Sequence, residues 1–288
     1  MKGGKNSCIV WIAKGRIIYF GRDCRRTDLI KRYGDKPEET TIARVLASLA
    51  ANVPSSVKYK LAWLKPAYIR LIRFWQPVIE VETRAGKMTW RVDALTSQRH
   101  LMGTYEPHMQ EAFCKYVRSG SVVFDIGAHA GFHSLFCGLL VRPGGQVFAF
   151  EPNPVSHASL SEQVRNNPGL RITVLSIALS DSAGTANFDA SMDCQSKLTE
   201  IGNVTVEVNM IDGLVGQIPA PHTIKIDVEG HEERVLRGGM KTLAKYRPVV
   251  LVDWNDDMTL QCVSALLAPI GYRILPGPPV IALPDSVV

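Results

Sequence analysis

The second part of the chain alternates between short apolar runs and longer segments of mixed polarity. The apolar residues in each run are continuous rather than alternating, which is typical of strands buried on both faces of a sheet. Helix-length segments separate the runs, so we predict an α/β fold with a mostly parallel, doubly wound sheet that binds ligands at the carboxyl ends of its strands. The runs are "SVVFDIG" (121–127), "GQVFAFEP" (145–152), "RITVLSIALS" (171–180), "HTIKIDVEG" (222–230) and "PVVLVDWN" (248–255).

The first part of the chain, residues 1–100, has a different pattern. "IVWIAKGRIIYF" (9–20) contains two short apolar stretches around a Lys-Gly turn, and "VIEVETRAGKMTWRVDA" (78–94) alternates on both sides of a turn. Each segment predicts a β-hairpin. We therefore expect an α+β N-terminal extension of unknown role over residues 1–100, followed by the α/β domain over residues 101–288.

Helices are predicted between the two hairpins. "TTIARVLASLAANV" (40–53) has apolar residues at helical spacing behind a capping Thr. "SSVKYKLAWLKPAYIRLIRFWQP" (55–77) mixes Lys and Arg with aromatic residues, and Pro66 separates it into two short helices. Residues 57–75 are suited to peripheral contact with an anionic membrane surface. The alternative, which we favour, is a helix docked on the protein body with its cations in solvent.

Charge and composition narrow the class of protein only slightly. The 288-residue chain has 46% hydrophobic residues and a formal net charge of +6, which fits an anionic partner without choosing one. Its six cysteines are scattered without a C-x-x-C pair, so we predict neither a zinc cluster nor a disulfide framework, and we expect a cytoplasmic protein. No apolar run approaches the roughly 18 residues that span a bilayer.

A glycine turn follows the first strand of the predicted sheet. In "VVFDIGAHAG", Gly127 and Gly131 let the backbone bend and let a ligand approach, because glycine has no Cβ. A phosphate-binding P-loop requires Gly-Lys followed by Ser or Thr, which this turn lacks. A dinucleotide fingerprint requires glycines where the chain has His129 and Phe132, so it is excluded as well.

The ligand that remains is S-adenosylmethionine, which has a ribose but no pyrophosphate. Glu151 ends the second strand, and a carboxylate at that point can accept hydrogen bonds from both ribose hydroxyls. Asp125 lies beside the glycine turn, where it is expected to hold the cationic amino-acid end of the ligand, directly or through water. Two carboxylates at these positions favour a binding site over a chance arrangement.

From about Gly103 to Trp254, the chain resembles the FkbM family of class I methyltransferases. "IKIDVEGHEERVLRG" (224–238) is the most specific block, because Asp-x-Glu-Gly-x-Glu after a fourth strand is typical of the family. The resemblance implies a Rossmann-like seven-stranded sheet with helices on both faces, S-adenosylmethionine as the methyl donor, and O-methylation of a sugar, glycan or secondary metabolite. The other blocks are "GTYEPHM" (103–109), "VVFDIGAHAGFHSL" (122–135), and "VFAFEPNP" (147–154) followed by "ALSDSAG" (178–184).

The resemblance also assigns the residues that bind the donor. Two positions depart from the family: His129 replaces a common Asn but can still form a hydrogen bond, and Asp253 stands at the end of the fifth strand, where Glu is common. By this resemblance the donor-binding residues are Asp125, Gly127 and Gly131 at the methionine end, Glu151 at the ribose, and Ile177 and Ala178 at the adenine.

The catalytic candidates lie in "DVEGHEE" after the fourth strand. A hydroxyl needs a base before it can attack a methyl group, and Asp227, Glu229 and His231 are the candidates. Asp227 and Glu229 point to the same face if the strand continues. The alternative is structural: these carboxylates pair with Lys225 or Arg234, or cap the following helix.

Other features of the sequence are less specific. We expect His133, on the helix after the glycine turn, to be packed rather than catalytic, and His108 is a candidate for covering the donor. No metal-ligand triad can be identified, so no metal is predicted. Two other functions stay open: an RNA or DNA methyltransferase on the same fold, and an inactive donor-binding partner subunit. Neither the acceptor nor the oligomeric state follows from the sequence.

Overall fold

The structure, a computed structural model, describes residues 9–13, 16–20, 76–189, 197–198, 204–253 and 257–285. The chain divides into two compact units, Met1–Asn52 and Val53–Val288. In the first unit, β1 (Ile9–Ala13) pairs antiparallel with β2 (Arg16–Phe20), which confirms the first predicted hairpin. The helices predicted between residues 40 and 75, including the basic-aromatic stretch, lie outside the described residues.

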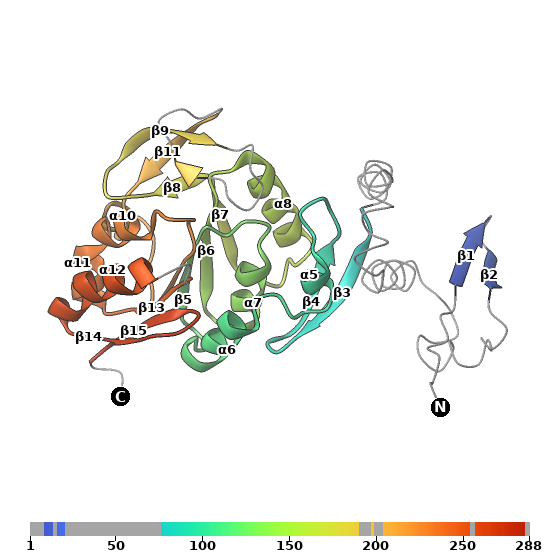
Figure 1. The fold of residues 1–288 in the computed structure, drawn as a ribbon, viewed down its shortest axis with the longest axis horizontal. Coiled ribbons are helices and arrows are strands. Elements are labelled where there is room, and N and C mark those ends of the chain that lie inside the picture. The colour runs from blue at the N-terminus through green and yellow to red at the C-terminus, as the bar shows by residue number, and fades with distance from the viewer. Residues whose placement is uncertain are drawn as a thin grey trace. The chain divides into compact units, whose positions relative to one another are not determined.

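A seven-stranded sheet forms the centre of the second unit (Figure 1). In spatial order its strands are β14 (Tyr272–Leu275), β15 (Val280–Pro284), β13 (Val249–Val252), β12 (Thr223–Ile226), β5 (Val122–Ile126), β6 (Gln146–Phe150) and β7 (Ile172–Leu175). The neighbours from β13 to β7 are parallel, and β15 is antiparallel to β13 and β14. The predicted α/β fold with a mostly parallel sheet is confirmed.

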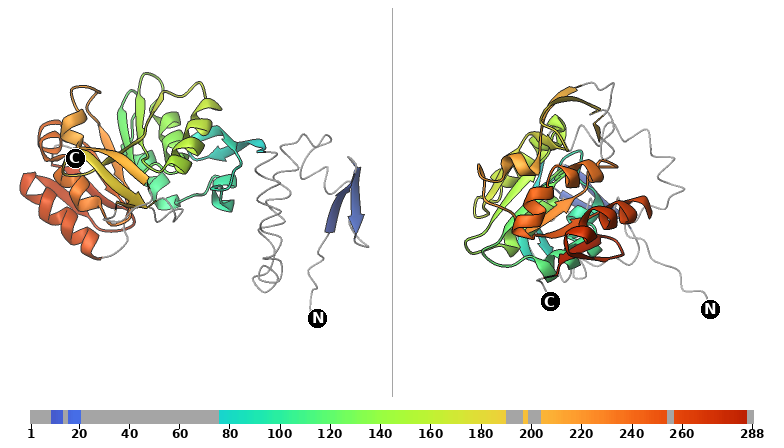
Figure 2. Two further views of the ribbon diagram at one scale, coloured as in Figure 1. Left: turned by 90° about the horizontal axis from the view of Figure 1, so that it is seen from above. Right: turned by 90° about the vertical axis from the view of Figure 1, so that its left-hand side faces the viewer.

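Helices cover both faces of this sheet, because successive side chains of a strand point to opposite faces. They include α7 (Phe132–Leu140), α8 (Pro154–Arg165), α10 (Glu232–Arg237) and α12 (Asp257–Leu267). On one face, Phe124 and Ile126 pack in a buried cluster with Val235 of α10. On the other, Ala149 packs against Leu160 of α8. Figures 1 and 2 show the orange and green helices on opposite sides of the strands.

Further helices lie in the described part of the second unit. Pro107 occupies the first turn of α6, as expected for a residue that lacks an N–H and has a helical φ. Within the part of the chain that the structure describes, no helix is both long and apolar enough to cross a membrane. Among the described residues, these further helices are α5 (Gln98–Leu101), α6 (Pro107–Tyr116), α9 (Ile211–Leu214), α11 (Met240–Tyr246) and the 3-10 helix η3 (Ala268–Ile270).

The apolar run at residues 171–180 forms two strands instead of one. Its first half is β7, and its second half is β8 (Ile177–Leu179), which pairs with β11 (Val204–Asn209) in a second sheet. This sheet also contains β9 (Gly184–Asp189) and β10 (Lys197–Leu198), and its order is β10, β9, β11, β8. The second sheet was not predicted. It places Ile177 and Ala178 next to the edge of the central sheet.

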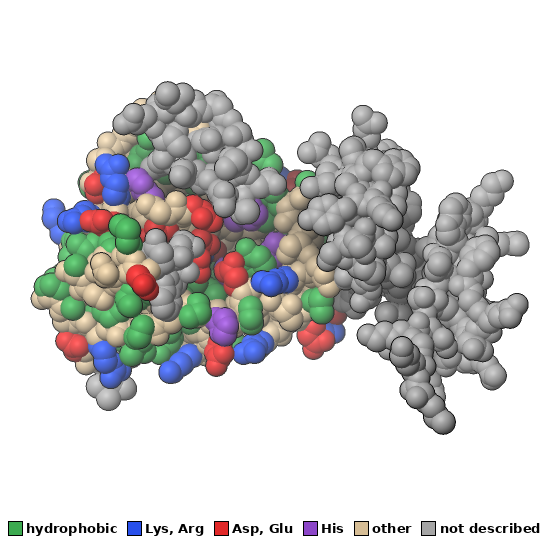
Figure 3. All heavy atoms as spheres, in the orientation of Figure 1, with side chains coloured by type: hydrophobic (Ala, Val, Ile, Leu, Met, Phe, Trp, Pro, Cys, Tyr) green, Lys and Arg blue, Asp and Glu red, His purple; other side chains and the backbone are tan. Residues whose placement is uncertain are grey.

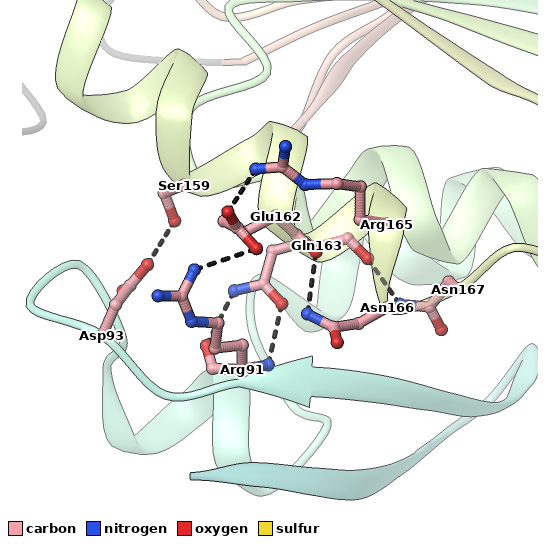
Figure 4. A network of polar contacts seen from close by, with 8 residues as sticks. All are labelled: Arg91, Asp93, Ser159, Glu162, Gln163, Arg165, Asn166 and Asn167. Atoms are coloured by element: carbon pink, nitrogen blue, oxygen red, sulfur yellow. Dashed lines mark hydrogen bonds and ion pairs between the residues drawn. The ribbon is translucent and has the colours of Figure 1, made fainter. Parts of the chain in front are cut away.

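The second hairpin, β3 (Val78–Thr83) and β4 (Gly86–Arg91), confirms the prediction for this segment. Side-chain amides of Gln163 in α8 and of Asn167, just after α8, bond to the backbone of β4, and Figure 4 shows the bonds between Gln163 and Arg91. Asn167 accepts from the N–H of Thr89 at 2.8 Å and donates to its carbonyl at 2.7 Å, and Gln163 forms the same pair of bonds with Arg91. These bonds satisfy backbone groups that an edge strand would otherwise expose. The domain boundary near residue 100 stays a prediction.

Candidate active site

A cavity opens at the carboxyl ends of β5, β6, β12 and β13, where the predicted sheet was expected to bind its ligand. Apolar, acidic and histidine side chains share its walls. The face of the molecule drawn in Figure 3 likewise has acidic side chains and histidines gathered near its middle. The sequence-predicted residues that line the cavity are Gly127, His129, Glu151, Ile177, Ala178, Asp227, Glu229 and His231.

The glycine turn between β5 and α7 bends as expected. Gly127 and Gly131 have φ values of 74° and 92°, and His129 between them also has a positive φ, 47°. A Cβ on Gly127 would lie 1.8 Å from the carbonyl oxygen of Asp227. The close approach at Gly127 is therefore made by the backbone that follows β12. Gly131 lies in a small adjoining cleft that shares Gly127, His129 and Asp227 with the main cavity.

Glu151 follows the last residue of β6 and is 6% exposed. Its Oε2 accepts a hydrogen bond from the N–H of His129 at 2.7 Å, and its Oε1 accepts one from the N–H of Asn153 at 2.8 Å. Burial raises the pKa of Glu151 to about 7, and the two N–H groups limit that rise. Each carboxylate oxygen has a second lone pair, so Glu151 can accept further hydrogen bonds from a ligand.

Asp125 has a different position from the one expected. Its side chain is fully buried, and among the described residues it does not belong to the cavity lining. Lys225 Nζ lies 3.2 Å from its Oδ1, and Ser134 Oγ of α7 donates to its Oδ2 at 2.5 Å. Asp125 lies within β5, in register with Lys225 of β12, so it points under α7 rather than over the edge of the sheet.

Lys225 links this buried group to the cavity. Besides its ion pair with Asp125, its Nζ lies 3.3 Å from Asp227 Oδ2 and donates to the carbonyl of Gly127 at 2.7 Å. Burial alone would lower the pKa of Lys225, but Asp125 and Asp227 raise it above its usual value. The ammonium group is therefore charged, and it orients Asp227. The ion pair between Lys225 and Asp227 confirms the prediction that Lys225 pairs with a carboxylate of the segment "DVEGHEE".

The residues after β12 do not continue the strand. β12 ends at Ile226, and Glu229 has a positive φ of 54°, so the same-face argument for Asp227 and Glu229 does not apply. Both residues line the cavity nevertheless, because the loop turns back on itself. Burial raises the pKa of Glu229, and the nearby Asp227 adds to the rise.

The remaining polar residues of this loop are partly structural. Glu232 Oε1 accepts hydrogen bonds from the N–H groups of Val228 and Gly230, at 3.3 and 3.0 Å, so this carboxylate stabilises the loop before α10. Arg234 pairs with Asp181, outside the cavity lining among the described residues. His231 Nε2 lies 2.9 Å from Ser180 Oγ, and burial lowers the pKa of His231, which favours a neutral imidazole.

Sequence reasoning missed several residues on the cavity wall. Of the two other histidines considered, His108 is exposed, whereas His133 is buried as expected. The motif that contains His108 contributes Tyr105 and Glu106 to the cavity wall instead of His108. Pro107, which starts α6, was the signal in the sequence that these two residues directly precede a helix. The residues missed are Tyr105 and Glu106 before α6, Asn153 at the N-cap of α8, and Phe188 of β9. Asp253 after β13, noted from the sequence only as a departure from the family, also lines the cavity.

A sheet in this order, with a carboxylate-lined cavity at the carboxyl ends of its central strands, defines a class I methyltransferase. A family model described as the methyltransferase FkbM domain matches residues 125–269. The hexuronic acid methyltransferase AglP of Haloferax volcanii is 31% identical over 66% of this chain and 79% of its own length. The 31-O-demethyl-FK506 methyltransferase FkbM of Streptomyces tacrolimicus is 31% identical over 55% and 75%.

One solved structure, methyltransferase FkbM from Methylobacillus flagellatus, is 17% identical with a TM-score of 0.43, and the match covers 67% of this chain and 55% of that chain. The family model and the sequence relatives decide the assignment. The chain belongs to the FkbM methyltransferase family and is an S-adenosylmethionine-dependent methyltransferase.

Proposed function

We propose that the protein transfers the methyl group of S-adenosylmethionine to a hydroxyl oxygen of a sugar, glycan or secondary metabolite. The observation that carries the proposal is a single cavity with Glu151 on its wall after β6 and Asp227 on its wall after β12. The names of two relatives, a hexuronic acid methyltransferase and a 31-O-demethyl-FK506 methyltransferase, support this acceptor class. The scattered cysteines support a cytoplasmic location.

The residues present fit the donor. Ile177 and Ala178 offer an apolar border for the adenine, and Glu151 has lone pairs left for both ribose hydroxyls. The turn that contains Gly127 and His129 then borders the methionine end. The donor carries a positively charged sulfonium, so a cavity lined by carboxylates favours its binding electrostatically.

When bound, the donor supplies an activated methyl group, so the protein must position the acceptor oxygen and remove its proton. We assign proton removal to Asp227, whose side chain is 23% exposed and held by Lys225. Glu229 and His231 lie on the same wall and are placed to contact the acceptor. Because its imidazole is held by Ser180, His231 is better suited to orient the acceptor than to carry its proton.

A screen with isotope-labelled S-adenosylmethionine tests this function. The acceptors are uronic acid glycosides, hydroxylated macrocycles and RNA, and the product mass shows where the label goes. We expect label on a hydroxyl compound, and a loss of about 10²- to 10⁴-fold in kcat for Asp227→Asn with donor affinity retained. Labelling of RNA alone would support a nucleic-acid methyltransferase. Donor binding without transfer to any acceptor would support the inactive partner subunit.

A further inference from the structure

We propose that Glu106 binds the ammonium group at the methionyl end of S-adenosylmethionine. This inference rests on the proposed donor site. It assigns a role to the segment "GTYEPHM" (103–109), which contributes no residue to the sites proposed for the ribose and the adenine. Glu106 lines the cavity directly before α6, next to Tyr105, which lines both the cavity and its adjoining cleft.

A cationic group at the glycine turn needs a carboxylate partner other than Asp125. Asp125 is fully buried, its Oδ1 is ion-paired with Lys225, and its Oδ2 accepts a hydrogen bond from Ser134. A second cation brought to Asp125 would lie close to the Lys225 ammonium and would be repelled by it. The role first expected for Asp125 therefore passes to a carboxylate on the cavity wall.

Glu106 has the free bonding capacity that this role requires. Its Oε2 is buried and, among the described residues, has no hydrogen-bond partner. The nearest basic atom is His133 Nε2 at 3.6 Å, but burial lowers the pKa of His133 to about 3, so this imidazole is neutral near pH 7. Burial also raises the pKa of Glu106 to about 7, and Lys225 and a hydrogen bond with Tyr105 limit that rise. Glu106 is half-buried, and desolvation of a carboxylate is costly, so an ammonium group bound at its free Oε2 would relieve that cost.

The position of Glu106 matches the amino-acid end of the donor rather than its nucleoside end. His133, its neighbour, is in the first turn of α7, directly after the glycine turn that borders the methionine end. Glu151, which we assign to the ribose, lies at the end of the next strand, β6. The backbone at Glu106 has a positive φ of 43°, which a non-glycine residue adopts rarely and which is frequent at functional sites.

Calorimetry with S-adenosylmethionine and two ligands that lack part of it tests the assignment. S-adenosylhomocysteine keeps the ammonium group but has no sulfonium, and 5′-methylthioadenosine lacks the whole amino-acid end. We expect Glu106→Gln to weaken S-adenosylhomocysteine binding by about 10- to 100-fold, the range for a lost hydrogen bond between charged groups. Binding of 5′-methylthioadenosine should change less than about twofold. Glu111→Gln, which removes an exposed carboxylate from α6, the helix that follows Glu106, is the matched control and should change the binding of neither ligand.

Four results would overturn the inference. Equal losses for both ligands would assign Glu106 a structural role, and unchanged binding of both would remove it from the site. A loss confined to S-adenosylmethionine would place Glu106 at the sulfonium instead of the ammonium group. If the unaltered protein binds none of the three ligands, the proposed function fails together with the inference, and this result is distinct from the other three.

Discussion

Two carboxylates lie at the ends of neighbouring parallel strands, and the chain satisfies them in opposite ways. Asp125 lies inside β5 and is neutralised by Lys225 with help from Ser134. Glu151 directly follows β6 and, among the described residues, accepts only backbone N–H bonds, so it keeps capacity for a ligand. A difference of two residues in position relative to the strand end thus separates a residue that stabilises the fold from one that we assign to binding.

The largest expected effect is on the Asp125 side of this comparison. Lys225→Met leaves Asp125 as an uncompensated buried charge, which should lower the free energy of unfolding by about 3–5 kcal/mol. Urea denaturation measures the change, and Lys241→Met, at an exposed lysine of α11, is the control. Adding Asp125→Asn to Lys225→Met should recover part of the loss. If the double variant recovers nothing, the buried ion pair is not the cause.

On the Glu151 side, the effect should appear in binding. Glu151→Ala removes both acceptors for the ribose and leaves the N–H groups of His129 and Asn153 without their partner. We expect affinity for S-adenosylhomocysteine to fall by roughly 100-fold, as for hydrogen bonds to a charged group. Calorimetry measures it, with Glu233→Ala, an exposed carboxylate of α10, as the control. Unchanged affinity would remove Glu151 from the site.

Ser134→Ala separates the two roles further. The variant removes the hydrogen bond from Ser134 to Asp125 and should cost about 1.5–3 kcal/mol of stability, because the acceptor is charged and buried. Ligand affinity per folded molecule should stay the same. Thermal unfolding measures the first effect and calorimetry the second. A variant that keeps its stability but loses affinity would show that Asp125 acts in binding after all.

The smallest effect concerns pH. Burial raises the pKa of Glu151 to about 7, so the carboxyl is increasingly protonated below pH 7 and loses acceptor capacity for the ribose. Affinity for 5′-methylthioadenosine should therefore fall as the pH drops below about 7, by at most about tenfold per pH unit. That ligand lacks the amino-acid end, so Glu106 should not contribute. The slope should vanish in Glu151→Gln, and a slope that persists would assign it to another group.

Local signals in the sequence were sufficient for the four parallel strands at the centre of the sheet and for the glycine turn. Continuous apolar runs predicted β5, β6, β12 and β13, and the glycine positions predicted the bend into α7. Glu151 was also found, because its role depends only on following a strand. The run at residues 171–180 was harder, since its second half pairs with β11, about thirty residues further along. Which sheet a strand joins depends on a partner that its own pattern does not specify.

The placements that failed depend on contacts between distant segments. Asp125 and Lys225 are one hundred residues apart, and only the strand order places them side by side. Glu106 reaches the cavity because α6 packs next to α7, and no local sequence pattern predicts this contact between helices. Asp227 and Glu229 share the cavity through a loop with positive φ rather than through strand alternation. The sequence can thus predict which functional side chains lie near strand ends. The direction in which each of them points depends on tertiary packing.

The most direct test of the donor site is a crystal structure of the protein with S-adenosylhomocysteine. The account predicts both ribose hydroxyls within hydrogen-bond distance of the Glu151 carboxylate, with Asp125 still paired to Lys225 and out of contact with the ligand. A ligand bound elsewhere, or a ribose turned away from Glu151 while Asp125 contacts the amino-acid end, would contradict it.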